Sequence, residues 1–152
     1  MLLIVAIIVT AGYLFLLGFN NGRYHDVQCE AKLSYQDELE KNGFSFTTQV
    51  ILFLKRDGRA MAYLSGSLKD GEVTSDVYRH VYFTYKHQRS NQYHFDMTET
   101  NKMMRDTASN EQVAKMYKVL GLYRDFPIQI DEKEEYLMFG SKVLPMVLCV
   151  KQ

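Results

Sequence analysis

The feature that most constrains this chain is an apolar segment at its N-terminus. Residues 1–19 (MLLIVAIIVTAGYLFLLGF) carry no charged side chain, and every Lys, Arg, Asp and Glu lies beyond them. A helix of this length would measure about 28 Å, close to the roughly 30 Å hydrocarbon core of a bilayer. We therefore predict a transmembrane anchor over residues 1–20, which contacts the lipid bilayer through residues 2–19.

Three other interpretations of this segment fit less well. A cleaved signal peptide has a basic start, a shorter apolar core and a small-x-small cleavage site, whereas this segment begins MLLIV and ends LGFN. A lipoprotein would need a cysteine directly after the segment, and the first cysteine is Cys29. A helix buried in a soluble core would be amphipathic rather than apolar all round.

Residues 21–152 are predicted to form one β-rich domain, because a chain of 152 residues normally folds as a single unit. Charge does not fix the side of the membrane on which this domain lies. The positive-inside rule needs Lys or Arg beside the span, and Arg23 weakly favours a cytoplasmic domain. The two cysteines favour an oxidising compartment, so we predict a single-pass protein of the bacterial inner membrane with its C-terminal domain in the periplasm.

The two cysteines lie at opposite ends of the predicted domain. Cys29 follows the anchor closely, and Cys149 lies near the C-terminus. In an oxidising compartment such a pair predicts a disulfide, and closing so long a loop is worth about 4–5 kcal/mol in the chain-entropy model. The alternative is two buried free thiols, which pack as small hydrophobes.

Apolar and polar residues alternate along much of the domain. Residues 27–35 alternate with period two, which indicates a half-buried strand, and a meander of antiparallel strands is predicted over residues 44–100. Two Asp-Gly dipeptides, at Asp57 and Asp70, predict tight hairpin turns. The expected pairs are Leu54 with Met61 and Leu52 with Tyr63 across the first turn, and Leu68 with Val73, Leu64 with Val77 and Lys69 with Glu72 across the second.

A third hairpin around Ser90 has two candidate registers. A two-residue loop would pair apolar with polar side chains, and a three-residue loop (Arg89, Ser90, Asn91) would pair Tyr85 with Phe95 and Phe83 with Met97. A slip of one residue exchanges the two faces of a strand. We predict the three-residue loop, with Asn91 in the left-handed conformation.

The period changes after residue 100. Ser109 and Gln112 form a capping-box pattern, and Val113, Met116, Tyr117 and Leu120 follow at helical spacing until Gly121 ends the helix. Beyond it we predict a strand at residues 127–130, an acidic turn and a final hairpin about residues 140–141. Pro145 cannot donate to a strand ladder, so the last strand is predicted to lie at an edge or to bulge there.

The predicted fold class is therefore α+β and mainly β. An N-terminal transmembrane helix precedes a curled antiparallel sheet or small barrel, on which one helix packs. The first and last strands carry Cys29 and Cys149. If these strands are neighbours, the disulfide joins the seam of the barrel.

No catalytic, metal or cofactor pattern stands out, so we predict that the protein is not an enzyme and binds no cofactor. The four histidines do not have the spacing of metal ligands; they are His25, His80, His87 and His94. The sequence Ser65-Gly66-Ser67 and the acidic run at residues 131–135 are better explained as a tightly packed strand and a solvated turn. A net charge of +0 argues against a nucleic-acid partner.

Aromatic residues are dense on both faces of the third hairpin, more than one core face requires. They form either part of the core or a surface for a partner or an apolar ligand. The residues concerned are Tyr78, Tyr82, Phe83, Tyr85, Tyr93 and Phe95.

The layout resembles that of a known family. A charge-free span leads into a small domain with an early cysteine in a strand, Asp-Gly hairpins, a late helix and the C-terminal strand VLPMVLCV. This arrangement is similar, over the whole chain, to the FidL-like membrane proteins of enteric bacteria. The resemblance implies a periplasmic accessory protein, similar to ToxS-type partners, that binds and stabilises or modulates a membrane-tethered transcription regulator. The alternative function is a periplasmic module that binds a small apolar ligand such as a bile salt or a lipid.

Overall fold

The structure, a computed structural model, describes residues 26–37, 43–122, 125–140 and 145–152. The predicted anchor at residues 1–20 lies outside the described residues, and so does His25. Within the described ranges, no helix is both long and apolar enough to cross a membrane.

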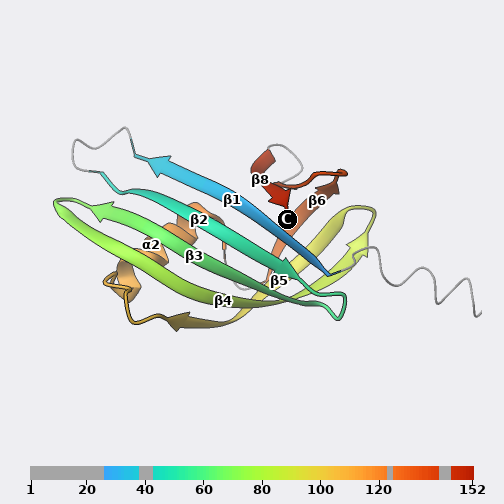
Figure 1. Cartoon of the computed structure of the whole chain (residues 1–152), viewed down its shortest axis with the longest axis horizontal. Helices are drawn as coiled ribbons and strands as arrows, with labels where there is room; N and C mark the ends of the chain where they lie inside the picture. The colour runs from blue at the N-terminus through green and yellow to red at the C-terminus, as the bar shows by residue number, and fades with distance from the viewer. Residues whose placement is uncertain (1–25, 38–42, 123–124, 141–144) are drawn as a thin grey trace, which may run out of the picture.

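The described chain forms a closed antiparallel barrel of eight strands and one helix, in which each strand pairs with its neighbours along the chain (Figure 1). The mainly β fold with one packed helix is therefore confirmed, in its barrel form. The strands are β1 (Val27–Gln36), β2 (Ser45–Leu54), β3 (Arg59–Asp70), β4 (Val73–Arg89), β5 (Gln92–Lys102), β6 (Phe126–Glu132), β7 (Tyr136–Gly140) and β8 (Pro145–Lys151), and the helix is α2 (Asn110–Val119).

The barrel closes where β1 meets β8. The ladder between these strands comprises the pairs Cys29 with Lys151 and Glu30 with Val150. Cys29 and Cys149 form a disulfide across the seam, with their Cα atoms 5.3 Å apart and a sequence separation of 120. The predicted disulfide is confirmed, and the alternative of two free thiols is wrong.

Alternation along the strands sends one set of side chains into a single core. Phe46, Leu64 and Leu68 on the early strands, with Val77 and Val81 on β4, are almost fully buried. Strands β2 to β5 form the meander that was predicted over residues 44–100, and β1 pairs with β2 beside it (Figure 1). The apolar faces of these strands meet inside the barrel.

The predicted register at the first Asp-Gly turn is wrong by one residue. Leu54 pairs with Ala60 rather than with Met61. The turn is a three-residue loop that ends at Gly58, whose φ of 83° lies in the left-handed region. A loop of this kind matches the twist of the strands as well as a two-residue turn does, and it places Leu54 and Ala60 together in the core.

The second turn lies at Gly71-Glu72 rather than at Asp70-Gly71. Asp70 pairs with Val73, and Leu68 with Ser75 rather than with Val73. The predicted pairs are wrong by two residues. Because a strand has a period of two, this shift leaves every side chain on its predicted face.

The predicted register of the third hairpin is confirmed, since Tyr85 faces Phe95. The left-handed residue is nevertheless Ser90, with φ 54°, and not Asn91. The predicted three-residue loop is also wrong, because Arg89 pairs with Gln92 and leaves Ser90 and Asn91 as the loop. The ladder shifts between His87 and Arg89, and this shift preserves the predicted pairing of Tyr85 with Phe95.

The helix and the last strand form as predicted. Ser109 caps α2 and makes the reciprocal capping-box contacts with Gln112, and Gly121 follows the helix with φ 68°. The ladder between β7 and β8 shifts where Gly140 pairs with Pro145, which is the bulge expected at that proline.

Candidate functional site

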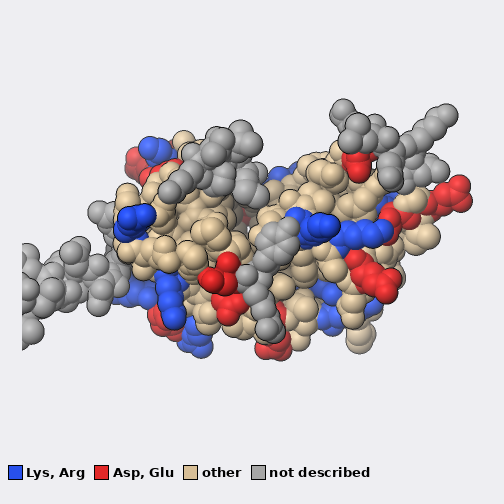
Figure 2. Space-filling model, turned by 180° about the vertical axis from the view of Figure 1, so that it is seen from behind, with Lys and Arg blue, Asp and Glu red and all other residues tan. Residues whose placement is uncertain are grey.

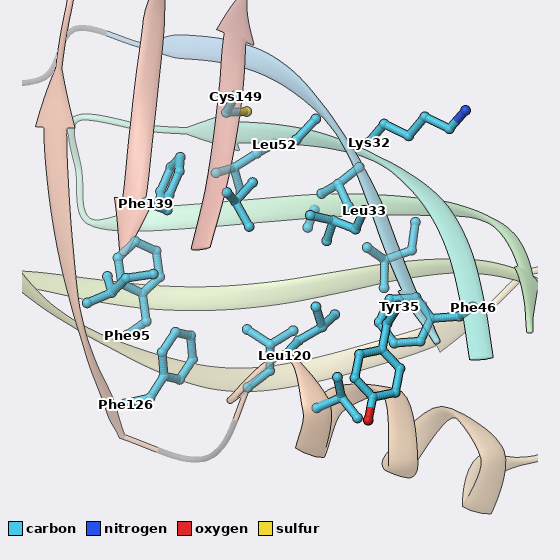
Figure 3. A pocket seen from close by; sticks show the side chains of 18 of the residues that line it. Lys32, Leu33, Tyr35, Phe46, Leu52, Phe95, Leu120, Phe126, Phe139 and Cys149 are labelled. Carbon is cyan, nitrogen blue, oxygen red and sulfur yellow. The ribbon is translucent and has the colours of Figure 1, made fainter. Parts of the chain in front are cut away.

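An apolar cavity of about 460 Å³ lies inside the barrel (Figure 3). Its volume is within the range of roughly 300–1,000 Å³ that is usual for small-molecule sites. The aromatic side chains that line it are Tyr35, Phe46, Phe83, Phe95, Phe126 and Phe139. Residues far apart in the sequence thus converge on one interior space.

Small side chains on two strands explain why the interior is not filled. Ala31 on β1 and Ala62 on β3 point inward and line the cavity. An eight-stranded barrel is just wide enough for side chains to fill it or for one small ligand to be held. Alanine at these inward positions therefore leaves space that a leucine or phenylalanine would occupy.

One wall of the cavity is a cluster of three phenylalanines. The ring centroids of Phe83 and Phe95 lie 6.2 Å apart, and Phe126 lies 6.2 Å from Phe83 and 5.7 Å from Phe95. Edge-to-face and stacked rings at these distances attract one another beyond their burial. The cluster gives the cavity one firm apolar wall, contributed by β4, β5 and β6.

The segment at the end of α2 closes one side of the cavity. Leu120 points from it into the cavity (Figure 3). Polar contacts hold the helix to the barrel; for example, Lys115 Nζ lies 2.6 Å from Asp70 Oδ2, and the hydroxyls of Tyr117 and Thr100 are 3.2 Å apart. The position of this wall therefore depends on contacts outside the cavity.

The cavity reaches the molecular surface along β1. Residues 31–35 all line it, although successive residues of a strand point to opposite faces. Lys32 points away from the interior, whereas Leu33 points into it (Figure 3). Because the described β1–β8 ladder ends at Glu30, the edge of β1 beyond that residue forms one side of the opening.

The cavity is suited to apolar contact. Among its described lining residues, Lys32 is the charged one, and it lies at the opening. Charges of both signs are interspersed on the outer face shown in Figure 2, without one large patch of a single sign. The features that define the candidate site are therefore the shape of the cavity and its apolar lining.

The structure divides the six aromatic residues, predicted as either core or a partner or ligand surface, between the inside and the outside of the barrel. Phe83, Tyr93 and Phe95 are buried in the barrel, and Phe83 and Phe95 line the cavity. Tyr78 and Tyr82 alternate with them and lie half-buried on the outer face of β4. The sixth residue, Tyr85, is half-buried and stacks on Phe95 with centroids 5.2 Å apart, and burial raises the pKa of its phenol to about 12.

The described histidines lie apart and have separate partners. His80 packs at the edge of Tyr63, with ring centroids 5.3 Å apart, and His94 Nδ1 lies 2.8 Å from Asp125 Oδ1. His87 Nε2 is 2.8 Å from the Ser90 carbonyl oxygen. No group of three metal-binding side chains occurs in the part of the chain that the structure describes.

A buried ion pair near α2 was not predicted from the sequence. Arg79 and Asp106 are 3% and 0% exposed, and the Arg79 Nε–H donates to Asp106 Oδ2 at 3.0 Å. Arg79 also donates to Asn110 Oδ1 (3.0 Å) and the Ala108 carbonyl (3.2 Å), and Lys102 Nζ lies 3.6 Å from Asp106 Oδ1. The pair fixes the loop that leads into α2.

The sequence contained signals for both features. Arg79 occupies an inward position between Val77 and Val81 in an alternating strand, and a charged residue there needs a buried partner. Ala31 and Ala62 also occupy inward positions. The space that these two small side chains leave becomes a cavity only when the strands are arranged around one barrel axis.

Comparison with known proteins does not extend these observations. No family model and no curated protein gives a match to this chain.

Proposed function

We propose that this protein is a membrane-anchored periplasmic barrel that binds a small apolar or amphipathic molecule in its interior. The observation that carries the proposal is the cavity of about 460 Å³, whose walls are phenylalanine, leucine, valine and alanine side chains. The Cys29–Cys149 disulfide supports an oxidising compartment. The uncharged segment at residues 1–19 supports the anchor.

The chemistry of the walls favours an aliphatic or steroid-like body for the ligand. Burying apolar surface is worth about 25 cal/mol per Å², so a molecule that fills such a cavity gains affinity without any charged contact. Lys32 and Ser34 at the opening are exposed to solvent. A polar head group would remain there while the apolar body enters.

A thermal-shift experiment tests this proposal. The full chain is placed in lipid nanodiscs, and its unfolding is followed with lauric acid or deoxycholate added below the concentration at which either forms micelles. A ligand that binds only the folded state stabilises it by about 2.7 kcal/mol at a hundred times its Kd. We expect an increase in Tm that saturates with ligand concentration.

Two variants of β3 serve as a matched pair in this experiment. Ala62→Leu fills the cavity, whereas Ser65→Leu adds a leucine to the outer face of the same strand. We expect the ligand-dependent increase in Tm to disappear in Ala62→Leu and to persist in Ser65→Leu. An increase that survives in Ala62→Leu, or the absence of any shift in the parent chain, would contradict the proposal.

A second function, binding of a membrane-tethered transcription regulator, has separate support. The outer face of β7 and β8 is apolar: Leu148 is 53% exposed, Val150 is 47% exposed, and they pair with Met138 and Tyr136. Exposed apolar patches beside an incompletely paired strand are frequent contact sites. This face, together with the resemblance to FidL-like proteins, supports an accessory role in the periplasm.

Site-specific crosslinking tests this second function. A photoreactive side chain at Leu148 is expected to crosslink to the periplasmic domain of a co-expressed regulator, because both proteins would be held in one membrane plane. The control position is Val73, which is 59% exposed on the β3–β4 hairpin. Equal crosslinking at both positions, or none at Leu148, would reject this contact.

A further inference from the structure

Part of the outer surface of the barrel is apolar. Outward positions of a sheet that faces water are normally polar, yet β2 and β3 present Ile51, Phe53, Met61 and Tyr63 there, and β4 presents Tyr82. These side chains are half-buried and are not part of the core cluster. We call these five residues the outer apolar face.

The members of the outer apolar face are direct neighbours across three strands. Phe53 pairs with Met61, Met61 pairs with Tyr82, and Ile51 pairs with Tyr63. Cross-strand neighbours on one face lie close enough for their side chains to touch. The five residues therefore form one continuous patch rather than isolated apolar positions.

The same strands are polar at their other end. Beyond the outer apolar face, the outward residues are Gln49 and Thr47 on β2, Ser65 and Ser67 on β3, and Asp76 on β4. They line a polar groove on this face of the sheet. One face of one sheet thus changes from apolar to polar along the strands.

The apolar end is the end at which the chain enters the barrel. Val27 pairs with Leu54 and Gln28 with Phe53, and the backbone N–H of Arg56 donates to Asp26 Oδ1 at 3.1 Å. The start of β1 and the β2–β3 turn lie together at one end of the long axis (Figure 1). Phe53, the first residue of the outer apolar face on β2, belongs to the second pair of the β1–β2 ladder.

The distance from the predicted anchor limits where the bilayer can be. Even fully extended, residues 20–26 reach no more than about 25 Å. By comparison, the 17 residues of β4 extend about 55 Å along the strand. An anchor that ends at residue 20 therefore keeps the apolar end of the sheet, where β1 begins, within about 25 Å of the membrane.

We propose that the outer apolar face lies on the surface of the bilayer that holds the anchor. Tyrosine and phenylalanine are favoured at this depth because their rings are apolar and the tyrosine hydroxyl reaches water. The adjacent β2–β3 turn carries Lys55, Arg56 and Arg59, which suit anionic head groups. Asp26 and Asp57 partly offset these cations. This inference rests on the anchor in the proposed function.

The chain contains no tryptophan, so a single introduced tryptophan reports on its own surroundings. The full chain is reconstituted in vesicles of phosphatidylethanolamine and phosphatidylglycerol. Lipids brominated near the head group are the quenchers for surface positions, and lipids brominated near the end of the acyl chain are the quenchers for Val9→Trp. Phe53→Trp probes the outer apolar face. Met104→Trp is the control, because Met104 is fully exposed in the loop after β5, at the opposite end of the barrel. Val9→Trp reports on the anchor.

We expect brominated lipid to reduce the emission of Phe53→Trp by roughly half, as for an indole at head-group level, and to leave Met104→Trp nearly unchanged. If Val9→Trp is quenched and Phe53→Trp is not, the anchor stands and this inference is wrong. If Val9→Trp is not quenched, both the anchor and this inference are wrong. Tyr82→Trp replaces Phe53→Trp if the latter fails to fold, and the same outcomes apply.

Discussion

Arg79 and Asp106 show how one inward charge organises a neighbouring element. Their ion pair is almost fully buried and joins β4 to the loop before α2. Asp106 Oδ2 also accepts the backbone N–H of Tyr78 at 3.0 Å. Because both side chains are buried, each charge is stabilised by its partner in place of water.

Removal of one member of this pair is expected to be costly. Asp106→Leu leaves the Arg79 guanidinium buried without its counter-ion, and we expect the free energy of unfolding to fall by about 3–5 kcal/mol. The double variant Arg79→Met/Asp106→Leu should recover most of this loss, since apolar packing replaces both charges. Urea unfolding monitored by circular dichroism measures both values, and a single variant that costs less than about 1 kcal/mol would refute the assignment.

Tyr85 gives the fold a predictable response to alkaline pH. Burial raises the pKa of its phenol from 10.0 to about 12 in the folded chain. A raised pKa means that the stabilisation is fully present below pH 10 and is lost as the pH rises from 10 toward 12. We expect Tm to fall less steeply over this range in Tyr85→Phe than in the parent chain. Parallel Tm profiles would show that Tyr85 is not responsible.

At the scale of elements, Gly66 permits a close approach between β3 and the backbone of β2. A Cβ atom at this position would lie 2.1 Å from the Thr47 carbonyl oxygen and 2.6 Å from the Thr48 Cα. These are backbone atoms of the paired strand and cannot turn aside. The sheet therefore folds closely at this point because position 66 has no side chain.

Replacement of Gly66 should separate β2 from β3 locally. We expect Gly66→Ala to lower the free energy of unfolding by about 1–3 kcal/mol, the usual cost of overpacking. Ser67→Ala, at the next position of the same strand, should have little effect because Ser67 is exposed. Chemical denaturation of the two variants compares them directly. Equal stabilities would show that the close approach is not required.

The elements were more predictable than their registers. Alternation and the capping box at Ser109 locate the strands and α2 from local sequence. The Asp57-Gly58 and Asp70-Gly71 turns were recognised, but each loop begins one residue later or is one residue longer than expected. Turn residues signal that the chain reverses, whereas the packing of Leu54 against Ala60 in the core selects the register.

For the whole molecule, the disulfide holds the seam of the barrel. The described β1–β8 ladder has the pairs Cys29 with Lys151 and Glu30 with Val150, so the covalent bond is a large part of the closure. The cavity wall includes Cys149. Cys149 therefore both closes the seam and lines the candidate ligand site.

Loss of the disulfide should strongly destabilise the barrel. We expect Cys29→Ala/Cys149→Ala to lower the free energy of unfolding by about 4–5 kcal/mol, as the chain-entropy model gives for a loop of 120 residues. Guanidinium denaturation measures the loss, and the oxidised parent chain with and without reductant is the control. A difference below about 1 kcal/mol would show that the other strand pairs suffice.

The barrel as a class could be predicted, but its cavity could not. The pairing of Cys29 with Cys149 was predicted from an even pair of cysteines, and the structure shows that the first and last strands are neighbours at this seam. The space beside Ala31 and Ala62 depends on barrel diameter and on which residues face each other across it. Those distances arise only when all the strands close together, and no local pattern encodes them.

The order in which the chain is made adds a consequence of this seam. The partner of β1 on one side is β8, which leaves the ribosome after every other described strand. A nascent chain therefore cannot close the barrel or form the disulfide until synthesis has passed Cys149. The wall of the cavity that contains Cys149 is added last, because β8 is the last described strand to be made.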